Sequence, residues 1–143
     1  MKNWFENKVL LVPVDFSDDS IKSVDEALAM ADAGDKVHVL HVAADLDVTT
    51  PGVVWESLSE DVQRKNVNEA FAKYFADPQY NGLNFHVAFG DAGHRIVERA
   101  EAIKADAIVM ASHGRTGFRR LLIGSVAERV LRLAHLPVVM LRH

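Results

Sequence analysis

The chain has 143 residues, a formal net charge of −4 and no cysteine. This length suits one domain, residues 1–143, and the lack of cysteine excludes disulfides and thiolate metal sites. The acidic balance argues against nucleic acid as a partner, because such partners usually require a basic face. No apolar run approaches the roughly 20 residues of a membrane-spanning helix. Because the first residues also lack a secretory pattern, we expect a cytoplasmic protein without a membrane partner.

The first predicted element is a strand over residues 8–15, Lys-Val-Leu-Leu-Val-Pro-Val-Asp. A continuous apolar run is typical of a strand that is buried on both faces of a parallel sheet. Pro13 has no N–H to donate, so we expect it near the end of that strand. Residues 16–20 carry oxygens that can cap a helix, and the apolar spacing predicts a helix that ends at Gly34.

The middle of the chain alternates between strand and helix patterns. In chain order, the patterns predict a strand, a loop, a helix and a strand at residues 36–43, 44–55, 57–76 and 83–90. His38 and His41 should point to opposite faces of their strand, because side chains alternate along a strand. Asp91 follows the third strand and can cap a further helix.

The last part of the chain repeats this alternation. Residues 106–111 are apolar throughout and predict a fourth strand, Ser125 opens a final helix, and residues 137–141 form a closing strand. Strict alternation of strands and helices predicts an α/β fold, a single doubly wound five-stranded parallel sheet with helices on both faces. The first and fourth strands are the most apolar, which favours the order 3-2-1-4-5. Ligands of such sheets bind at the carboxyl ends of the strands, where the winding reverses.

The segment between the fourth strand and the final helix combines glycines, hydroxyls and arginines. Gly114 and Gly124 would let backbone N–H groups approach a phosphate, and Arg115 could neutralise its charge. The helix that begins at Ser125 offers unpaired N–H donors to an anion. The same residues also fit a plain turn and a helix cap, and neither the dinucleotide nor the Walker spacing is present.

This segment resembles the signature of ATP-binding universal stress proteins, Gly-x2-Gly-x9-Gly-Ser/Thr. Here it reads Ala111-x2-Gly114-x9-Gly124-Ser125, with alanine in place of the first glycine. Residues 12–17, 126–131 and 136–141 are also similar to that family. On these motifs the chain is identified as a member of the universal stress protein family, with an adenine nucleotide alpha-hydrolase-like fold.

The resemblance implies a site for ATP, ADP or AMP at the carboxyl ends of the first and fourth strands. The residues implied are Pro13, Val14, Asp15, Val42, Met110, Ala111, Gly114, Arg115, Gly124, Ser125 and Val126. The first four would surround the adenine, the next two would lie under the nucleoside, and the rest would hold the phosphates. Mg²⁺ could accompany the phosphates, and no protein side chain is expected to bind a metal.

The resemblance also implies a homodimer that pairs through the last strand. The residue pattern agrees, because residues 137–141 would form an apolar sheet edge that needs a cover. The favoured function is therefore a stress-associated regulatory protein that binds a nucleotide. One alternative is a nucleotide-free dimeric interaction protein, which Ala111 favours. The other is a very slow ATPase, for which Asp15 has no visible acid–base partner.

Overall fold

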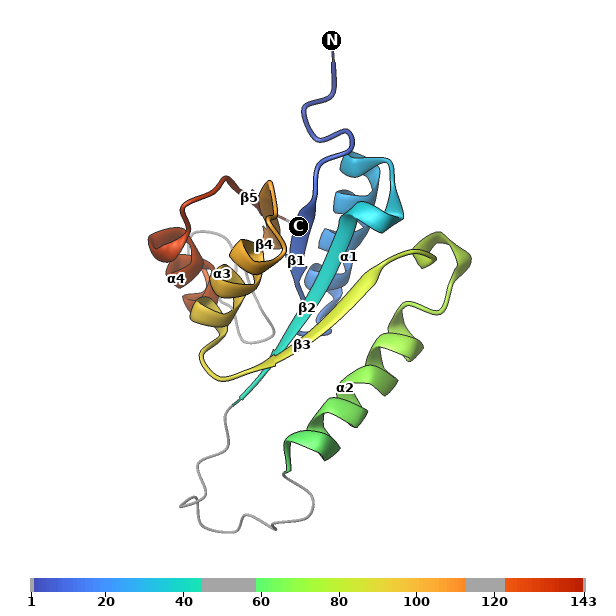
Figure 1. Ribbon diagram of the computed structural model, residues 1–143, viewed down its shortest axis with the longest axis vertical. Coiled ribbons are helices and arrows are strands. Elements are labelled where there is room, and N and C mark those ends of the chain that lie inside the picture. Colours follow the sequence, from blue (N-terminus) through green and yellow to red (C-terminus); the bar gives the residue numbers. More distant parts are fainter. Residues whose placement is uncertain (1, 45–58, 113–122, 143) are drawn as a thin grey trace.

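The computed structural model describes residues 2–44, 59–112 and 123–142. These residues form a five-stranded sheet in the order β3-β2-β1-β4-β5 (Figure 1). All four pairings between neighbouring strands are parallel. The predicted fold class and strand order are therefore confirmed, and the winding reverses between β1 and β4. Within the described ranges, no helix is long and apolar enough to cross a bilayer.

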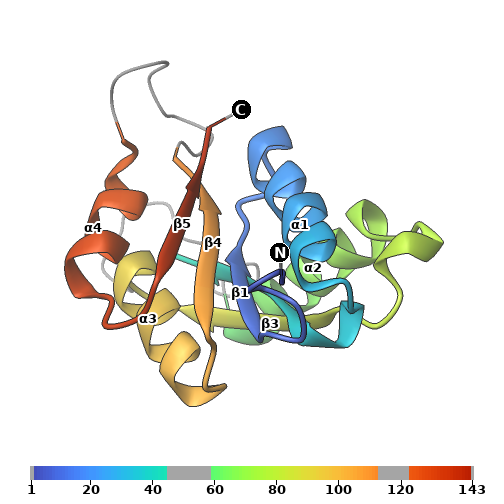
Figure 2. The same cartoon turned by 90° about the horizontal axis from the view of Figure 1, so that it is seen from above.

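The strands and helices alternate along the chain. The strands are β1 (Leu10–Pro13), β2 (Val37–Ala43), β3 (Asn84–Phe89), β4 (Ala107–Ala111) and β5 (Val138–Leu141). The α-helices are α1 (Asp18–Ala31), α2 (Glu60–Tyr74), α3 (Ala92–Ala102) and α4 (Ser125–Leu133). Two short 3-10 turns, η1 (Gly34–Lys36) and η3 (Pro78–Tyr80), precede β2 and β3. Figure 2 shows α1 and α2 on one face of the sheet and α3 and α4 on the other.

Three predicted helix bounds were wrong, and one of them is the end of the second helix, which lies at Tyr74 rather than at residue 76. The first helix ends at Ala31, because Asp32 takes a left-handed conformation (φ 52°) and its N–H closes the last turn on the Leu28 carbonyl. Gly34 instead allows a close approach, since a Cβ there would lie 2.7 Å from the Asn81 carbonyl oxygen. The second helix begins at Glu60 rather than at residue 57, because the side chain of Ser59 caps it.

The central strands separate two apolar cores. Leu10 and Val12 of β1 are fully buried in the core under α1 and α2, whereas Leu11 is fully buried in the core under α3 and α4. This division follows from the alternation of side chains along a strand. Each such side chain contributes roughly 1.5–3 kcal/mol by leaving water. Apolar packing therefore fixes the sheet from both faces, and with it the positions of the strand ends at the carboxyl edge.

The two central strands share the shortest ladder of the sheet, which we call the seam. β1 pairs with β4 only at Leu10↔Ala107 and Leu11↔Ile108, although β4 pairs with β5 as far as Ala111. The Val14 N–H donates to Leu40 of β2, so alternation turns the backbone of Pro13 toward β4. A proline has no N–H, and the next bond of the seam cannot form. Pairing between β1 and β4 therefore stops before their carboxyl ends.

Candidate functional site

Asp15 follows β1 directly and lies half-buried at the carboxyl edge of the sheet. Its Oδ1 accepts hydrogen bonds from the Ser17 N–H (3.0 Å) and from the Ser17 hydroxyl. Ser17 is itself the N-cap of α1 and accepts from the Ser20 N–H. The start of α1 therefore holds the Asp15 carboxylate at the end of β1.

Val42 presents its backbone to the space beyond the end of β1. The last pair between β1 and β2 is Pro13↔Leu40, and β2 continues to Ala43. The Leu40 carbonyl accepts from the Val14 N–H, so it faces the β1 side of β2. Because backbone groups alternate along a strand, the N–H and C=O of Val42 face the same side. They are therefore directed at the sheet edge where the winding reverses.

The end of β4 and the start of α4 meet at the same edge. The Gly124 N–H donates to the Ser112 carbonyl (2.7 Å), and this bond ties the first residue before α4 to the residue after β4. Gly124 is the N-cap of α4 and has no side chain with which to cap it. Ser125 and Val126, in the first turn, are exposed. The amino end of α4 therefore faces the edge, and among the described residues no side chain is recorded as capping its first N–H groups.

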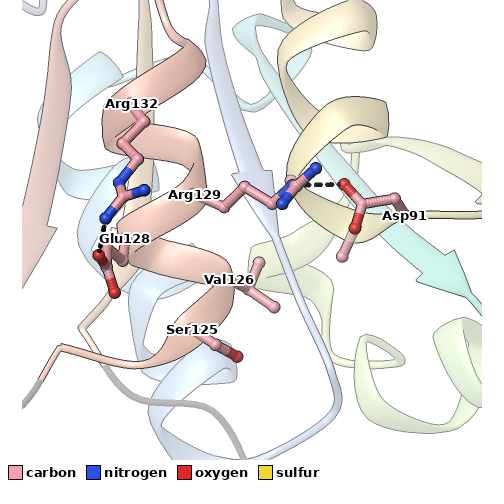
Figure 3. A pocket seen from close by; sticks show the side chains of 8 residues that line it. Asp91, Ser125, Val126, Glu128, Arg129 and Arg132 are labelled. Atoms are coloured by element: carbon pink, nitrogen blue, oxygen red, sulfur yellow. Dashed lines mark hydrogen bonds and ion pairs between the residues drawn. The ribbon is translucent and has the colours of Figure 1, made fainter.

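A groove of about 450 Å³ lies between the first turns of α3 and α4 (Figure 3). Its lining residues are Asp91, Ala92, Gly93, Ser125, Val126, Glu128, Arg129 and Arg132. Arg129 reaches from α4 to Asp91, with 2.9 Å between its Nε and Oδ2, as Figure 3 shows. Arg132 pairs with Glu128 on α4 itself. The pKa of Asp91 is lowered, chiefly by the hydrogen bond from the backbone N–H of His94. The side chains of His94 and Arg129 lower it further.

Gly93 allows the close packing of the two helices that border this groove. A Cβ at this position would lie 2.6 Å from Cγ of Arg129, closer than real contacts allow. The stem of Arg129 therefore occupies the place that a side chain on α3 would need. A side chain at position 93 would therefore have to displace Arg129, which forms the ion pair with Asp91.

The comparisons with known proteins show the family and agree with the fold. The sequence profile of the Universal stress protein family matches residues 6–142. The chain belongs to this family. Universal stress protein MJ0531 of Methanocaldococcus jannaschii is 35% identical over 141 residues, which cover 94% of this chain and 82% of that protein.

Two solved structures resemble this universal stress protein closely in fold. The hypothetical protein MJ0577 of Methanocaldococcus jannaschii has a TM-score of 0.73 and 26% identity, covering 95% of this chain and 96% of that one. A universal stress protein in complex with cAMP has a TM-score of 0.60 and 19% identity, covering 94% of this chain and 96% of that one. The likeness to the cAMP complex shows the shared fold.

The structure brings most of the predicted site residues to one edge of the sheet. Those at strand ends are Pro13, Val14, Asp15, Val42, Met110 and Ala111, and those at the start of α4 are Gly124, Ser125 and Val126. Gly114 and Arg115 lie outside the described residues, as does the segment that surrounds them. Of the predicted site residues that the structure describes, Ser125 and Val126 alone line the groove between α3 and α4.

Six groove residues were not predicted as site residues, and Ala92 and Glu128 are two of them. The other four are Asp91, which was predicted only as a helix cap, and Gly93, Arg129 and Arg132. The sequence does carry a signal for the two arginines, because positions 125, 129 and 132 fall on one face of a helix. It carries none for Gly93, whose role depends on how α3 packs against α4.

A histidine pair under α3 was also missed, because its members are far apart in sequence. His38 Nδ1 lies 2.8 Å from His86 Nε2, and Arg99 donates to His86 Nδ1 at 2.9 Å. Arg99 can only donate, so His86 donates onward to His38, and both rings are held neutral. Burial, then Arg99 and His38, lower the pKa of His86 to about 4. His41 faces the opposite core, beside Phe16, as predicted.

Proposed function

We propose that this universal stress protein is a stress-associated regulatory protein that binds ATP, ADP or AMP at the carboxyl ends of β1 and β4. The observation that carries the proposal is the convergence of two features at the winding reversal. The Val42 backbone N–H and C=O face the edge, and the uncapped start of α4 faces the same edge. An adenine ring and an anionic group fit these two features.

The strand ends would recognise the nucleoside. An adjacent N–H and C=O on Val42 match the acceptor and donor that adenine presents side by side along one edge. The Asp15 carboxylate can accept from an amino or hydroxyl group of the ligand, and Ser17 holds it in place. Pro13 contributes by ending the seam, because it leaves room between β1 and β4. Met110 and Ala111 end the facing strand.

The start of α4 would hold the phosphates. The first N–H groups of α4 and the Ser125 hydroxyl are donors, and the helix dipole favours negative charge at this end. Gly124 adds no side chain that would occupy this space. Gly114 and Arg115 belong to the same proposal. Mg²⁺ would be held through phosphate oxygens.

Ala111 is compatible with this arrangement. The residue is only 8% exposed, and alternation along β4 directs its methyl group to the same face as Val109, toward α1. Little of the methyl group is therefore presented at the sheet edge. The cAMP complex of another universal stress protein supports an adenine nucleotide as the class of ligand for this fold.

Calorimetry on protein freed of nucleotide tests this proposal directly. We expect heat of binding with ATP, ADP or AMP at millimolar concentration or below, at one nucleotide per chain. Native mass spectrometry of freshly purified protein should show the same nucleotide. An absence of heat with all of the nucleotides would end the proposal. It would favour the second candidate, a nucleotide-free dimeric interaction protein. Ala111 supports this candidate, because it replaces the first glycine of the family signature.

The proposal includes a homodimer that pairs through residues 137–141, in the cytoplasm. β5 is an edge strand, and its four apolar residues are only half-buried. The Leu141 carbonyl accepts from the N–H of Ser112, the residue after β4, so alternation turns the backbone of Met140 outward. Met140→Pro should therefore yield monomers by native mass spectrometry while the sheet stays intact. Val139→Pro is the matched control. It removes a backbone N–H that faces β4, so it should unfold β5 instead of only separating the dimer.

Hydrolysis is at most a weak accessory activity in this proposal. A base for an attacking water would have to come from the sheet edge, and Asp15 already accepts two hydrogen bonds from Ser17. A single-turnover assay with ATP and an Asp15→Asn variant separates genuine hydrolysis from a contaminant. With each protein in sufficient excess to bind all of the ATP, we expect no measurable difference in hydrolysis rate between the variant and the natural chain.

A further inference from the structure

His41 makes an unusual hydrogen bond at the end of β1. Its Nδ1 lies 2.9 Å from the carbonyl oxygen of Val14. A carbonyl oxygen can only accept, so Nδ1 carries the hydrogen and donates it. The side chain of one strand thus binds the backbone of its neighbour, where a backbone N–H would normally do so.

The Val14 carbonyl is the acceptor that would continue the β1–β2 ladder. Val14 donates its N–H to Leu40 (2.8 Å), and in a regular parallel ladder its carbonyl would then accept from the Val42 N–H. The pairing of β1 with β2 instead ends at Pro13↔Leu40. The imidazole of His41 therefore takes the bond that Val42 would have made.

A strained turn holds the His41 ring in this position. Phe16 has a φ of 63°, a left-handed conformation that is rare for a bulky side chain. Its ring packs on the His41 ring at 4.9 Å between centroids, and on Phe71 and Tyr74 of α2 at 5.4 Å each. Because aromatic packing on α2 fixes Phe16, the turn and the imidazole are held together.

We propose that His41 is a positioning residue for the nucleobase. Its Nδ1–H draws the Val14 carbonyl out of the sheet ladder, which leaves the Val42 N–H directed at the base. This inference rests on the proposed nucleotide site, and it adds a residue that acts through Val14 and Val42 without touching the ligand. The recognised group is the hydrogen-bond acceptor on the adenine edge, so ATP, ADP and AMP should depend on His41 equally.

Three variants of His41 separate the donor from the ring. Asparagine places an amide nitrogen near the position of Nδ1, glutamine places one near Nε2, and leucine carries no donor. We expect His41→Leu and His41→Gln to weaken AMP binding roughly tenfold, and His41→Asn to recover most of that loss, by calorimetry. Equal losses in all three variants would indicate a merely structural role and overturn the inference. Thermal unfolding of each variant identifies any that fails to fold, and His41→Asn compared with either of the other two still decides. If His41→Asn itself does not fold, an NMR coupling across the Val42–Val14 ladder position decides instead.

A second measurement needs no nucleotide. In ¹⁵N,¹³C-labelled protein, a through-hydrogen-bond coupling between the Val42 nitrogen and the Val14 carbonyl carbon reports the ladder bond. We expect no coupling in the natural chain and a coupling in His41→Leu, where Val42 regains its acceptor. A coupling in the natural chain, or none in His41→Leu, would overturn the inference. If the natural chain binds no nucleotide, the proposed function fails, and this coupling still decides how His41 acts on Val42.

Discussion

The starts of α3 and α4 lie at the same edge and on the same face of the sheet, yet they are built differently (Figures 1 and 3). Asp91 caps α3 by accepting from the His94 N–H, and it also binds Arg129. The N-cap of α4 is Gly124, whose φ of −60° and ψ of 156° suit any residue, so its conformation does not require glycine. Where the N-cap side chain accepts from a backbone N–H of the first turn, it stabilises the helix. Where the N-cap residue has no such side chain, those N–H groups can donate to a ligand.

The largest expected effect comes from making the start of α4 resemble that of α3. Gly124→Asp would supply a cap and should stabilise the protein by about 0.5 kcal/mol. The carboxylate would also take the N–H donors and repel the phosphates, so ATP affinity should fall by roughly 100-fold or more, about 2.7 kcal/mol. Calorimetry and thermal unfolding measure the two effects separately.

Gly124→Ser is the matched control, because serine caps the helix without a charge. The ATP affinity of Gly124→Ser should lie between that of the natural chain and that of Gly124→Asp. If Gly124→Asp bound ATP as tightly as the natural chain, the uncapped start of α4 would have no role in binding.

The reciprocal change removes the cap from α3. Asp91→Ala loses the bonds to His94 and Arg129, so the midpoint of thermal unfolding should fall by a few degrees. ATP affinity should change by less than about twofold, because Asp91 serves the fold. A large loss of ATP affinity at unchanged stability would contradict this division between the two helices.

Acid should loosen α3 while it leaves α4 in place. The pKa of His86 is about 4 in the folded protein and 6.5 as an ordinary value, so the unfolded chain takes up its proton first as the pH falls. The contribution of neutral His86 to the free energy of unfolding is therefore fully present above pH 6.5 and is lost as the pH falls toward 4. Hydrogen exchange corrected for the intrinsic rate at each pH should show lower protection at pH 5 than at pH 7 at the carboxyl end of α3, near Arg99.

His86→Phe separates this effect from general acid denaturation. It removes the titrating ring and should flatten the pH dependence of unfolding between pH 6.5 and 4. Asp91 acts in a lower range, since its pKa is depressed from 3.8 and its stabilisation is lost only as the pH falls through that lower value. An unchanged pH dependence in His86→Phe would show that another group is responsible.

The smallest expected effect concerns the surface of α4. Arg132 pairs with Glu128 one turn away, and both side chains are largely exposed, so Arg132→Ala should cost only about 0.3–0.5 kcal/mol. ATP affinity should stay within about twofold, although Arg132 lines the groove. A loss larger than tenfold would assign the anion to the groove instead of the start of α4.

Local patterns predicted the sheet well, because each depends on nearby residues. The apolar runs at residues 8–15 and 106–111 marked the central strands and with them the strand order. Gly124 and Ser125 marked the start of α4 and the predicted phosphate site. The extent of the domain, residues 1–143, and the roles of Gly114 and Arg115 stay predictions.

Features that join distant segments could not be predicted. His38 and His86 are 48 positions apart and meet only because β2 and β3 pair in one register. Arg129 reaches Asp91 because Gly93 lets two helices approach, and neither spacing nor composition contains that approach. The bond from His41 to Val14 likewise depends on where the ladder between two strands stops.

The seam divides the sheet into two unequal parts. β3, β2 and β1 come from the first two thirds of the chain and β4 and β5 from the rest, and two residue pairs join them where the other ladders have four or six. α1 packs on β1, β2 and β4, so it contacts strands on both sides of the seam. Under mechanical load or mild denaturant, we expect the protein to part along this line first, with β4, α4 and β5 leaving as a unit.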